Sequence, residues 1–274
     1  MSIFAPKFSF PLGAAFAVLI SAAPPATVTA QQAGSQPDFQ NAWLAMGGEF
    51  KETGGTPTPT RQDPRYRYVP NNTSEQPTYR IGDVTNPNFK PWVAAAMRKD
   101  NDEVLAGKFA YTARSSCAAA GVPGFMGFGA QPIYFVQTPG EVLMIFQGDA
   151  QVRHVHMNAP HSANPKSSWY GESIGHYEGD TLVVDTIGLN NKTFLDAYRT
   201  PHSDKLHVTE RWRKPSGDRL EVLITVDDPE AFNRPFSVMQ RYGRVPQTLV
   251  EQVCAENNGY FFGARVPTAD KPDF

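Results

Sequence analysis

One stretch of the chain, residues 169–186, constrains the fold more than any other. Its sequence is WYGESIGHYEGDTLVVDT, and we interpret it as a β-hairpin. The turn is expected at Glu178-Gly179-Asp180, because glycine adopts positive φ without steric cost. Thr181 to Ile187 is apolar and β-branched, which is typical of the returning strand.

The glycines of this hairpin indicate a candidate site. Gly171 and Gly175 lie on one face of an extended strand, so that face has space above it for a bend, a crossing element or a ligand. Ionisable and polar side chains flank this space: Glu172, Ser173, His176 and Asp185. The pattern predicts a site here but identifies no substrate.

The register of the hairpin decides which side chains meet. With a two-residue turn at Glu178-Gly179, Glu172 lies opposite Asp185, and one of two such close carboxyls would have a raised pKa that suits acid–base work. With a three-residue turn and a glycine bulge, Asp185 moves to the face of Ser173. A third interpretation makes Asp185 a hydrogen-bonded residue at a strand end.

Short strands dominate the chain from residue 132. Besides the hairpin, we predict strands at 133–137, 142–146, 152–157, 206–213, 219–226, 236–242 and 248–254. Short links between them predict a mainly β fold, an antiparallel meander barrel of the lipocalin-like kind or a sandwich. The 24 prolines and 22 glycines also favour a loop-rich β fold over a helical bundle.

The chain before residue 132 divides into two segments. Residues 1–30 resemble a signal peptide, with Lys7, an apolar run over 12–23 and small residues at 28–30. We therefore expect a periplasmic or secreted protein without a membrane anchor. Residues 31–131 are expected to form an irregular arm packed on the main domain, which spans 132–274.

The arm contains one predicted helix, from Pro91 to Ala106. Proline suits the first helical position, and Gly107 suits the C-terminal cap. We expect this surface helix to pack through Trp92, Val93, Ala96 and Leu105.

The chain has two cysteines, Cys117 and Cys254. In an oxidising compartment a disulfide is the simplest interpretation of such a pair. The long loop that it would close corresponds to at most about 4–5 kcal/mol of stabilisation. A free catalytic thiol is the alternative, but the apolar neighbours Ala118, Ala119 and Val253 favour a buried bridge.

The charge pattern and the motifs exclude two classes of function. The formal net charge is −2 and there is no basic stripe, so we expect no nucleic-acid partner. There is no Rossmann or P-loop signature, so no nucleotide cofactor is expected.

Residues 153–161 hold the densest group of histidines. On a strand His154 and His156 share a face, which is a metal-ligand spacing, and His161 could be a third ligand. Gly148, six residues before His154, resembles the start of a cupin metal motif, but the glutamate that such a motif needs is absent. The alternative is a pair of surface or pocket histidines on an ordinary strand.

Two further positions are candidates for acid–base chemistry. His202 stands beside Ser203 and Asp204, but adjacent residues seldom form a triad and no G-x-S-x-G motif occurs, so His202 would act alone. Alternation places Glu210 on the apolar face of its strand, where a carboxylate must be paired, protonated or functional. Arg153 or Arg241 could pair with Glu210 in a structural ion pair, whereas Arg211 faces the other side.

Several of these segments together resemble a known group of proteins. Exported bacterial proteins of unknown function share the sequence motifs S-I-G-x-x-E-G-D-T-L-V-V-D-T, P-H-S and E-R. Similar motifs occur here in the hairpin, at Pro201-His202-Ser203 and at Glu210-Arg211. The resemblance covers about residues 115–258. It implies an exported β-rich domain and no particular activity.

These features lead to one predicted function and two alternatives. We predict an exported, cofactor-independent lyase, isomerase or hydrolase that binds a small organic or sugar-like substrate in a barrel pocket. Catalysis is assigned to His161, His202, Asp185 and Glu210, and substrate binding to Arg153, Arg211, Glu172, His176 and Tyr170. The alternatives are a non-catalytic ligand-binding barrel and a metal enzyme that uses His154, His156 and His161. An open sandwich edge would also favour a homodimer.

Overall fold

The structure is a computed structural model that describes residues 36–47, 50–70, 73–75, 78, 80–108, 117–127, 131–253, 260–261 and 264–265. The described residues belong to one compact unit. The predicted signal peptide, residues 1–30, lies outside the described residues, so its assignment stays a prediction.

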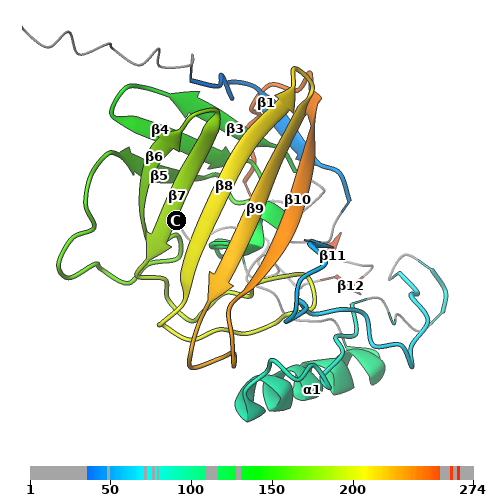
Figure 1. Ribbon diagram of the computed structural model, residues 1–274. Helices are drawn as coiled ribbons and strands as arrows, with labels where there is room; N and C mark the ends of the chain where they lie inside the picture. The colour runs from blue at the N-terminus through cyan, green and yellow to red at the C-terminus, as the bar shows by residue number, and fades with distance from the viewer. Residues whose placement is uncertain are drawn as a thin grey trace, which may run out of the picture. The chain divides into compact units, whose positions relative to one another are not determined.

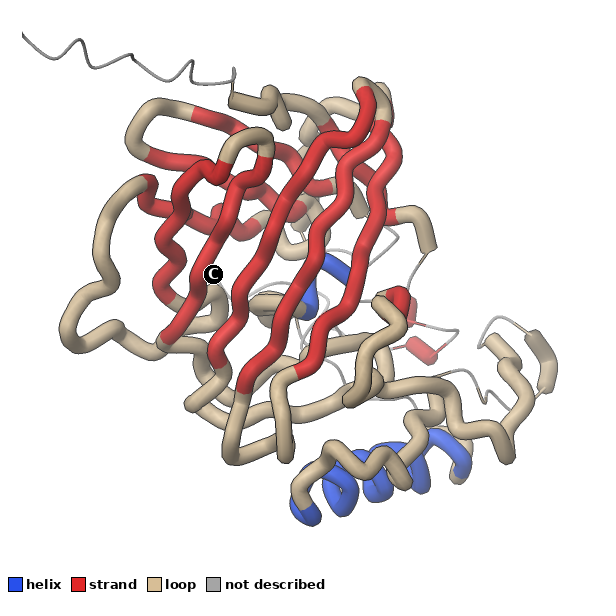
Figure 2. The backbone as a smooth tube through the Cα atoms, viewed as in Figure 1, coloured by secondary structure: helices blue, strands red, loops and turns tan. Residues whose placement is uncertain are grey.

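Within the described residues, nine strands close into a β-barrel, which confirms the predicted barrel (Figures 1 and 2). Strand β1 closes the barrel by pairing with both β3 and β10. The barrel strands are β1 (Ala42–Ala45), β3 (Ile133–Gln137), β4 (Glu141–Phe146), β5 (Gln151–Met157), β6 (Glu172–Glu178), β7 (Thr181–Ile187), β8 (His207–Ser216), β9 (Arg219–Asp227) and β10 (Phe236–Val245). The short β2 (Lys51–Glu52) adds to β10, and β11 (Tyr260–Phe261) pairs with β12 (Ala264–Arg265).

The barrel interior is a packed core. Every second residue of β9 is buried, as its period-two pattern predicts. Large side chains from several strands meet inside, and the ring centroids of Phe135 and Trp212 lie 5.2 Å apart. Phe125, from the short 3₁₀ helix η2 (Gly124–Gly127), also belongs to this core and contacts Phe146.

The segment predicted as an irregular arm contributes one strand to the barrel. Residues 42–45 of the expected arm form β1, which lies between β3 and β10. Without β1, both neighbours would present unpaired backbone groups at an open edge. The closed barrel also removes the exposed edge on which the predicted homodimer depended, and the homodimer stays a prediction.

The prediction of an entirely antiparallel barrel is also wrong at one seam. Strands β5 and β6 pair in parallel, through Val155–Met157 and Ser173–Gly175 alone. Parallel neighbours need a crossover connection, which residues 158–171 provide. The pairing stops at Ser173 because Gly171 has a φ of +65°, which turns the chain away from β5.

The hairpin forms with a register that neither predicted alternative contains. Its turn is Gly179-Asp180, because Glu178 pairs with Thr181. Asp185 therefore lies opposite Ile174, on the outward face that also carries Glu172.

The space expected above Gly175 is filled by side chains of the neighbouring strand β5. A Cβ at Gly175 would lie 2.8 Å from Cγ1 of Val155 and 3.1 Å from the sulfur of Met157. The absence of a side chain at Gly175 thus lets β5 pack closely against β6.

Two other expectations differ from the structure. The strand predicted at 248–254 is absent from its described part, residues 248–253. Cys254 lies outside the described residues, so the disulfide between Cys117 and Cys254 stays a prediction. The helix α1 spans Pro91–Leu105, close to the predicted range, but buries Val93, Met97, Asn101 and Val104 and leaves Trp92 42% exposed. Across the described residues, no helix has the length and hydropathy to span a membrane.

The close packing at Gly175 gives a first testable prediction. Gly175→Ala should lower the free energy of unfolding by roughly 1–3 kcal/mol, because the added methyl overlaps a β-branched side chain in the seam. Gly140→Ala is the matched control, since a Cβ there meets nothing within 4 Å. Urea denaturation of both variants measures the difference, and equal stabilities would contradict the packing described for the seam.

Candidate functional site

The predicted site residues fall into separate places, of which the first is the barrel interior. Arg153 of β5 is 1% exposed and Glu210 of β8 is 0% exposed, and they form a two-point ion pair with N–O distances of 2.7 and 3.0 Å. Arg153 also donates to Ser173 of β6 at 3.1 Å and to Thr186 of β7 at 2.7 Å. The indole of Trp212 donates to Glu210 at 2.8 Å.

This network agrees with the structural alternative predicted for Glu210, with Arg153 as the partner. A guanidinium has five N–H donors, and those of Arg153 are directed at Ser173, Thr186, Glu210 and the sulfur of Met144. None is left for a ligand anion. The predicted role of Arg153 in substrate binding therefore has no support from its contacts.

A second group lies on the outer face of strands β6–β8. His161, from the crossover, stands between two carboxylates, with Nδ1 3.0 Å from Glu172 and Nε2 2.7 Å from Asp185. The second oxygen of Asp185 lies 2.7 Å from Nε2 of His207. Glu172 also accepts hydrogen bonds from the backbone N–H and the hydroxyl of Ser162. This outer cluster is partly exposed, by 19% at His161 and 33% at Asp185.

The electrostatics of the outer cluster correct an expectation. The closeness of Glu172 and Asp185 was expected to raise the pKa of one of them, but the pKa values of both carboxyl groups are lowered. Hydrogen bonds from Ser162 lower the pKa of Glu172, and the hydrogen bond with His207, followed by that with His161, lowers the pKa of Asp185. Imidazole and hydroxyl donors separate the two groups, so both carboxylates stay ionised at neutral pH.

Sequence reasoning missed His207, which completes this cluster. Its pKa is raised, chiefly by the hydrogen bond with Asp185. Asp185 lies opposite Thr209 in the sheet, and His207 is two residues away on the same outward face. Alternation along β8 places His207 on the same face as Thr209. It could have predicted the contact with Asp185 only if the register of β7 against β8 had been known.

An open groove of about 660 Å³ adjoins the outer cluster at the seam between β5 and β6. One side is the outward face of β5 with His154 and His156, and the other is the crossover and the start of β6. The further lining residues are Gln151, Val152, Arg153, Ser162, Asn164, Lys166, Ser168, Trp169, Tyr170, Gly171, Glu172 and Ser173. The groove thus brings together Tyr170 and Glu172, two of the predicted substrate-binding residues, while Arg153 stays engaged inside.

The other two predicted substrate-binding residues lie elsewhere. Arg211 is 2.7 Å from Glu178, and His176 is 3.1 Å from the same carboxylate. This exposed ion-pair group stands at the turn of the hairpin and does not line the groove.

His202 also lies apart from the other predicted catalytic residues. It is 2% exposed, with Nε2 2.8 Å from the hydroxyl of Thr193 and Nδ1 2.8 Å from the carbonyl oxygen of Ser203. Burial lowers its pKa, so it is neutral at pH 7 and can donate from Nδ1 and accept at Nε2. Ser203 in turn donates to Asp228. These contacts indicate that His202 holds the loop together.

The three histidines predicted as metal ligands do not come together. His154 and His156 approach Glu141, with N–O distances of 2.7 and 3.8 Å, whereas His161 contacts Glu172 and Asp185. In the part of the chain that the structure describes, no group of three or more His, Cys, Asp or Glu side chains is arranged to hold a metal ion.

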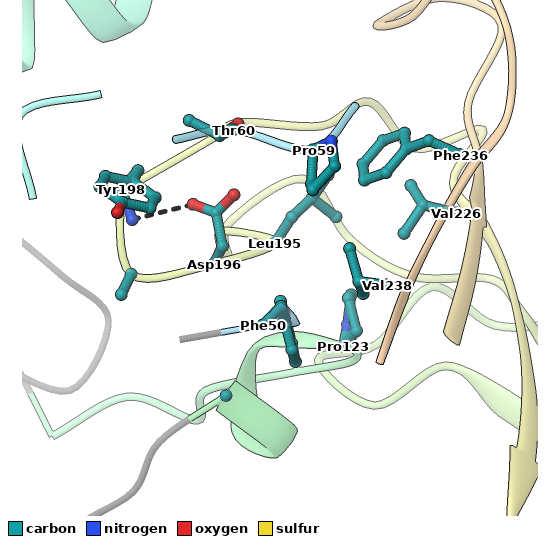
Figure 3. Close-up of a pocket in the computed structure, with 12 residues that line it drawn as sticks. Phe50, Pro59, Thr60, Pro123, Leu195, Asp196, Tyr198, Val226, Phe236 and Val238 are labelled. Carbon is teal, nitrogen blue, oxygen red and sulfur yellow. Dashed lines mark hydrogen bonds between the residues drawn. The ribbon is translucent and has the colours of Figure 1, made fainter. Parts of the chain in front are cut away.

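A second pocket, missed by sequence reasoning, lies between strands β9 and β10 and residues of three other segments, 50–60, 123–127 and 195–198 (Figure 3). The lining is mainly apolar and includes Phe50, Pro123 and Phe236, whereas the carboxylate of Asp196 is directed toward Tyr198 and Thr60. Burial raises the pKa of Asp196. The pocket has a volume of about 20 Å³, which is room for about one water molecule. Asp196 accepts hydrogen bonds from the backbone N–H of Tyr198 and the hydroxyl of Thr200, which is a turn-forming arrangement.

No protein-family model, curated protein or solved structure matches this chain. The resemblance to exported bacterial proteins of unknown function therefore stays a prediction.

The interior ion pair gives a second testable prediction. Arg153→Met should lower the free energy of unfolding by roughly 3–5 kcal/mol, because it leaves Glu210 buried without its partner. The double variant Arg153→Met with Glu210→Leu should recover most of that loss. Chemical denaturation of the three proteins tests this, and a double variant no more stable than the single one would contradict the pairing.

The outer cluster gives a third prediction, about pH. The raised pKa of His207 stabilises the fold below its ordinary value of 6.5, and this contribution is lost as pH rises through the raised value. The lowered pKa of Asp185 stabilises the fold above its ordinary 3.8 and is lost at more acid pH. The stability difference between the wild type and Asp185→Asn should therefore be largest between the ordinary pKa values of the two groups, 3.8 and 6.5, and shrink as pH rises through the raised pKa of His207. A difference that does not vary with pH would contradict the assignment.

Proposed function

We propose that the protein binds a small, polar, sugar-like ligand in the groove between β5 and residues 158–171. The observation that carries the proposal is the groove itself. Its volume of about 660 Å³ lies within the usual range of roughly 300–1,000 Å³ for small-molecule sites. The proposal follows the ligand-binding alternative but moves the ligand from the barrel interior to the outer wall.

The lining of the groove supports a ligand with many hydroxyl groups. Trp169 and Tyr170 are half-buried aromatic residues, and such rings offer a rigid amphipathic surface to the C–H face of a sugar. Around them stand hydroxyl, amide, ammonium and imidazole groups, which can bond to sugar hydroxyls: Ser162, Asn164, Lys166, Ser168, His154 and His156.

The positions of the predicted catalytic residues favour binding over the acid–base enzyme. Glu210 is buried in the barrel, His202 is buried in a loop, and His161 and Asp185 lie on the outer face. General acid–base catalysis requires groups within hydrogen-bonding reach of one substrate, and these four residues do not surround a common space.

A sugar titration gives the fourth testable prediction. Tryptophan fluorescence and NMR titrations with glucose, galactose, galacturonate and cellobiose should reveal at least one ligand, with millimolar or tighter affinity. Trp169→Ala should weaken its binding by roughly tenfold, as expected for an aromatic contact of about 1.4 kcal/mol. Trp92→Ala is the matched control, since Trp92 lies on α1 and does not line the groove.

The proposal fails if none of these sugars binds, or if Trp169→Ala and Trp92→Ala bind a sugar equally well. Chemical shifts that change at residues around Asp196, and not at the groove, would direct the search to the second pocket.

One contact favours a second candidate, an acid–base enzyme that acts on a ligand in the same groove. Glu172 lines the groove and is joined through His161 to Asp185 and His207. If this candidate holds, NMR should detect product from a bound sugar, and Glu172→Gln should abolish turnover while retaining binding. Binding without any product would leave the non-catalytic function.

The location of the protein belongs to the same proposal. We infer export to the periplasm or medium from residues 1–30, which have the order of a signal peptide. Mass spectrometry of the expressed protein should find a mature N-terminus near residue 31.

A further inference from the structure

The crossover, residues 158–171, is fixed to the barrel at both ends. At its start the backbone N–H of Asn158 donates to Gly175 at 2.7 Å, and at its end Ser168 exchanges backbone hydrogen bonds with Gly188 and Asn190. Its middle reaches the outer face through His161 and Ser162. The same segment forms one side of the groove.

The contact at His161 depends on its protonation. Each ring nitrogen faces a carboxylate oxygen, and a neutral imidazole has only one N–H. The ring can therefore donate to Glu172 and Asp185 together only as the imidazolium. When the proton is lost, a nitrogen lone pair faces a carboxylate and one of the two contacts becomes repulsive.

We propose that His161 is a proton-dependent latch, which holds residues 158–171 against the outer face of the barrel and so fixes the shape of the binding groove. The latch closes when the imidazolium bridges Glu172 and Asp185, and it opens when the ring loses its proton. This inference rests on the proposed function only for its effect on ligand affinity.

The charged groups around His161 set the direction of the effect. From the strands beneath come Glu172 of β6, Asp185 of β7 and, sharing Asp185, His207 of β8. On β5, His156 projects from the same outer face, opposite Ile174 in the pairing of the strands. Both carboxylates have lowered pKa values, so they keep their charge well into the acid range. The latch is therefore strongest in mildly acid solution and weakens as pH rises.

Hydrogen exchange tests the latch without any ligand. The backbone N–H of Ser162 donates to Glu172 at 2.7 Å and reports on the attachment of the segment. After correction for the pH dependence of the intrinsic exchange rate, the protection factor of the Ser162 amide should fall by roughly tenfold between pH 6 and pH 9 in the wild type. In His161→Ala the protection should be low at both values.

Matched variants keep the test decisive. His176→Ala removes another exposed histidine of the same outer face, which pairs with Glu178 outside the groove, and should behave as the wild type does. If His161→Ala folds poorly, His161→Gln replaces it, because its amide can donate to a carboxylate but carries no titrating proton. Protection at Ser162 that is independent of pH, or unchanged in the His161 variants, would overturn the latch.

Ligand affinity provides the second readout. If cellobiose binds, its affinity should fall several-fold from pH 6 to pH 9 in the wild type and vary less in His161→Gln. A pH-dependent Ser162 amide with no binding of glucose, galactose, galacturonate or cellobiose would support the latch and count against the sugar proposal. Binding that is equally tight at both pH values would contradict the coupling between the latch and the groove.

Discussion

The buried ion pair between Arg153 and Glu210 is the interaction on which the rest of the barrel depends. The seam between β5 and β6 is held by only a short parallel ladder, from Val155 to Met157. Arg153 stands on β5 two residues before that ladder begins, and its side chain reaches across the interior to β6, β7 and β8. It thereby connects four strands across a seam with a short backbone ladder. A buried charge pair is costly to desolvate, so its value here is the geometry that it imposes.

The groove and the outer cluster follow from the same seam. Because the ladder stops at Ser173 and the chain turns at Gly171, the strands part and leave an opening over Arg153. A parallel pair also needs a crossover, and this one carries His161 across the outer face. The interior stays a packed core, whereas the outer wall gains a polar groove and a set of histidine–carboxylate contacts.

The sequence was sufficient where local pattern determines structure. Apolar runs between turn residues located β3 to β7 and β10, period-two alternation located β8 and β9, and Pro91 with Gly107 marked the limits of α1. The burial of Glu210 on an apolar face, and Arg153 as a possible partner, also followed from alternation. These inferences needed only the periodicity of a strand and the cost of an unpaired buried charge.

The remaining features depend on contacts between distant segments. The hairpin register, the parallel seam and the closure by β1 are set by which strands meet, and local pattern does not encode this. Those choices placed Asp185 beside His207 and His161, and they separated His202 and Glu210 from both. The four residues assigned to catalysis do not form one group, because they come from three surroundings that only the fold distinguishes.

A crystal structure of the mature protein soaked with a binding sugar would test the central claim most directly. The account predicts sugar density in the groove, with one face of the ring against Trp169 and hydroxyl groups near Ser162 or Asn164. It also predicts that Arg153 remains paired with Glu210 beneath the ligand. Density inside the barrel, with Arg153 turned toward the sugar and away from Glu210, would contradict the account.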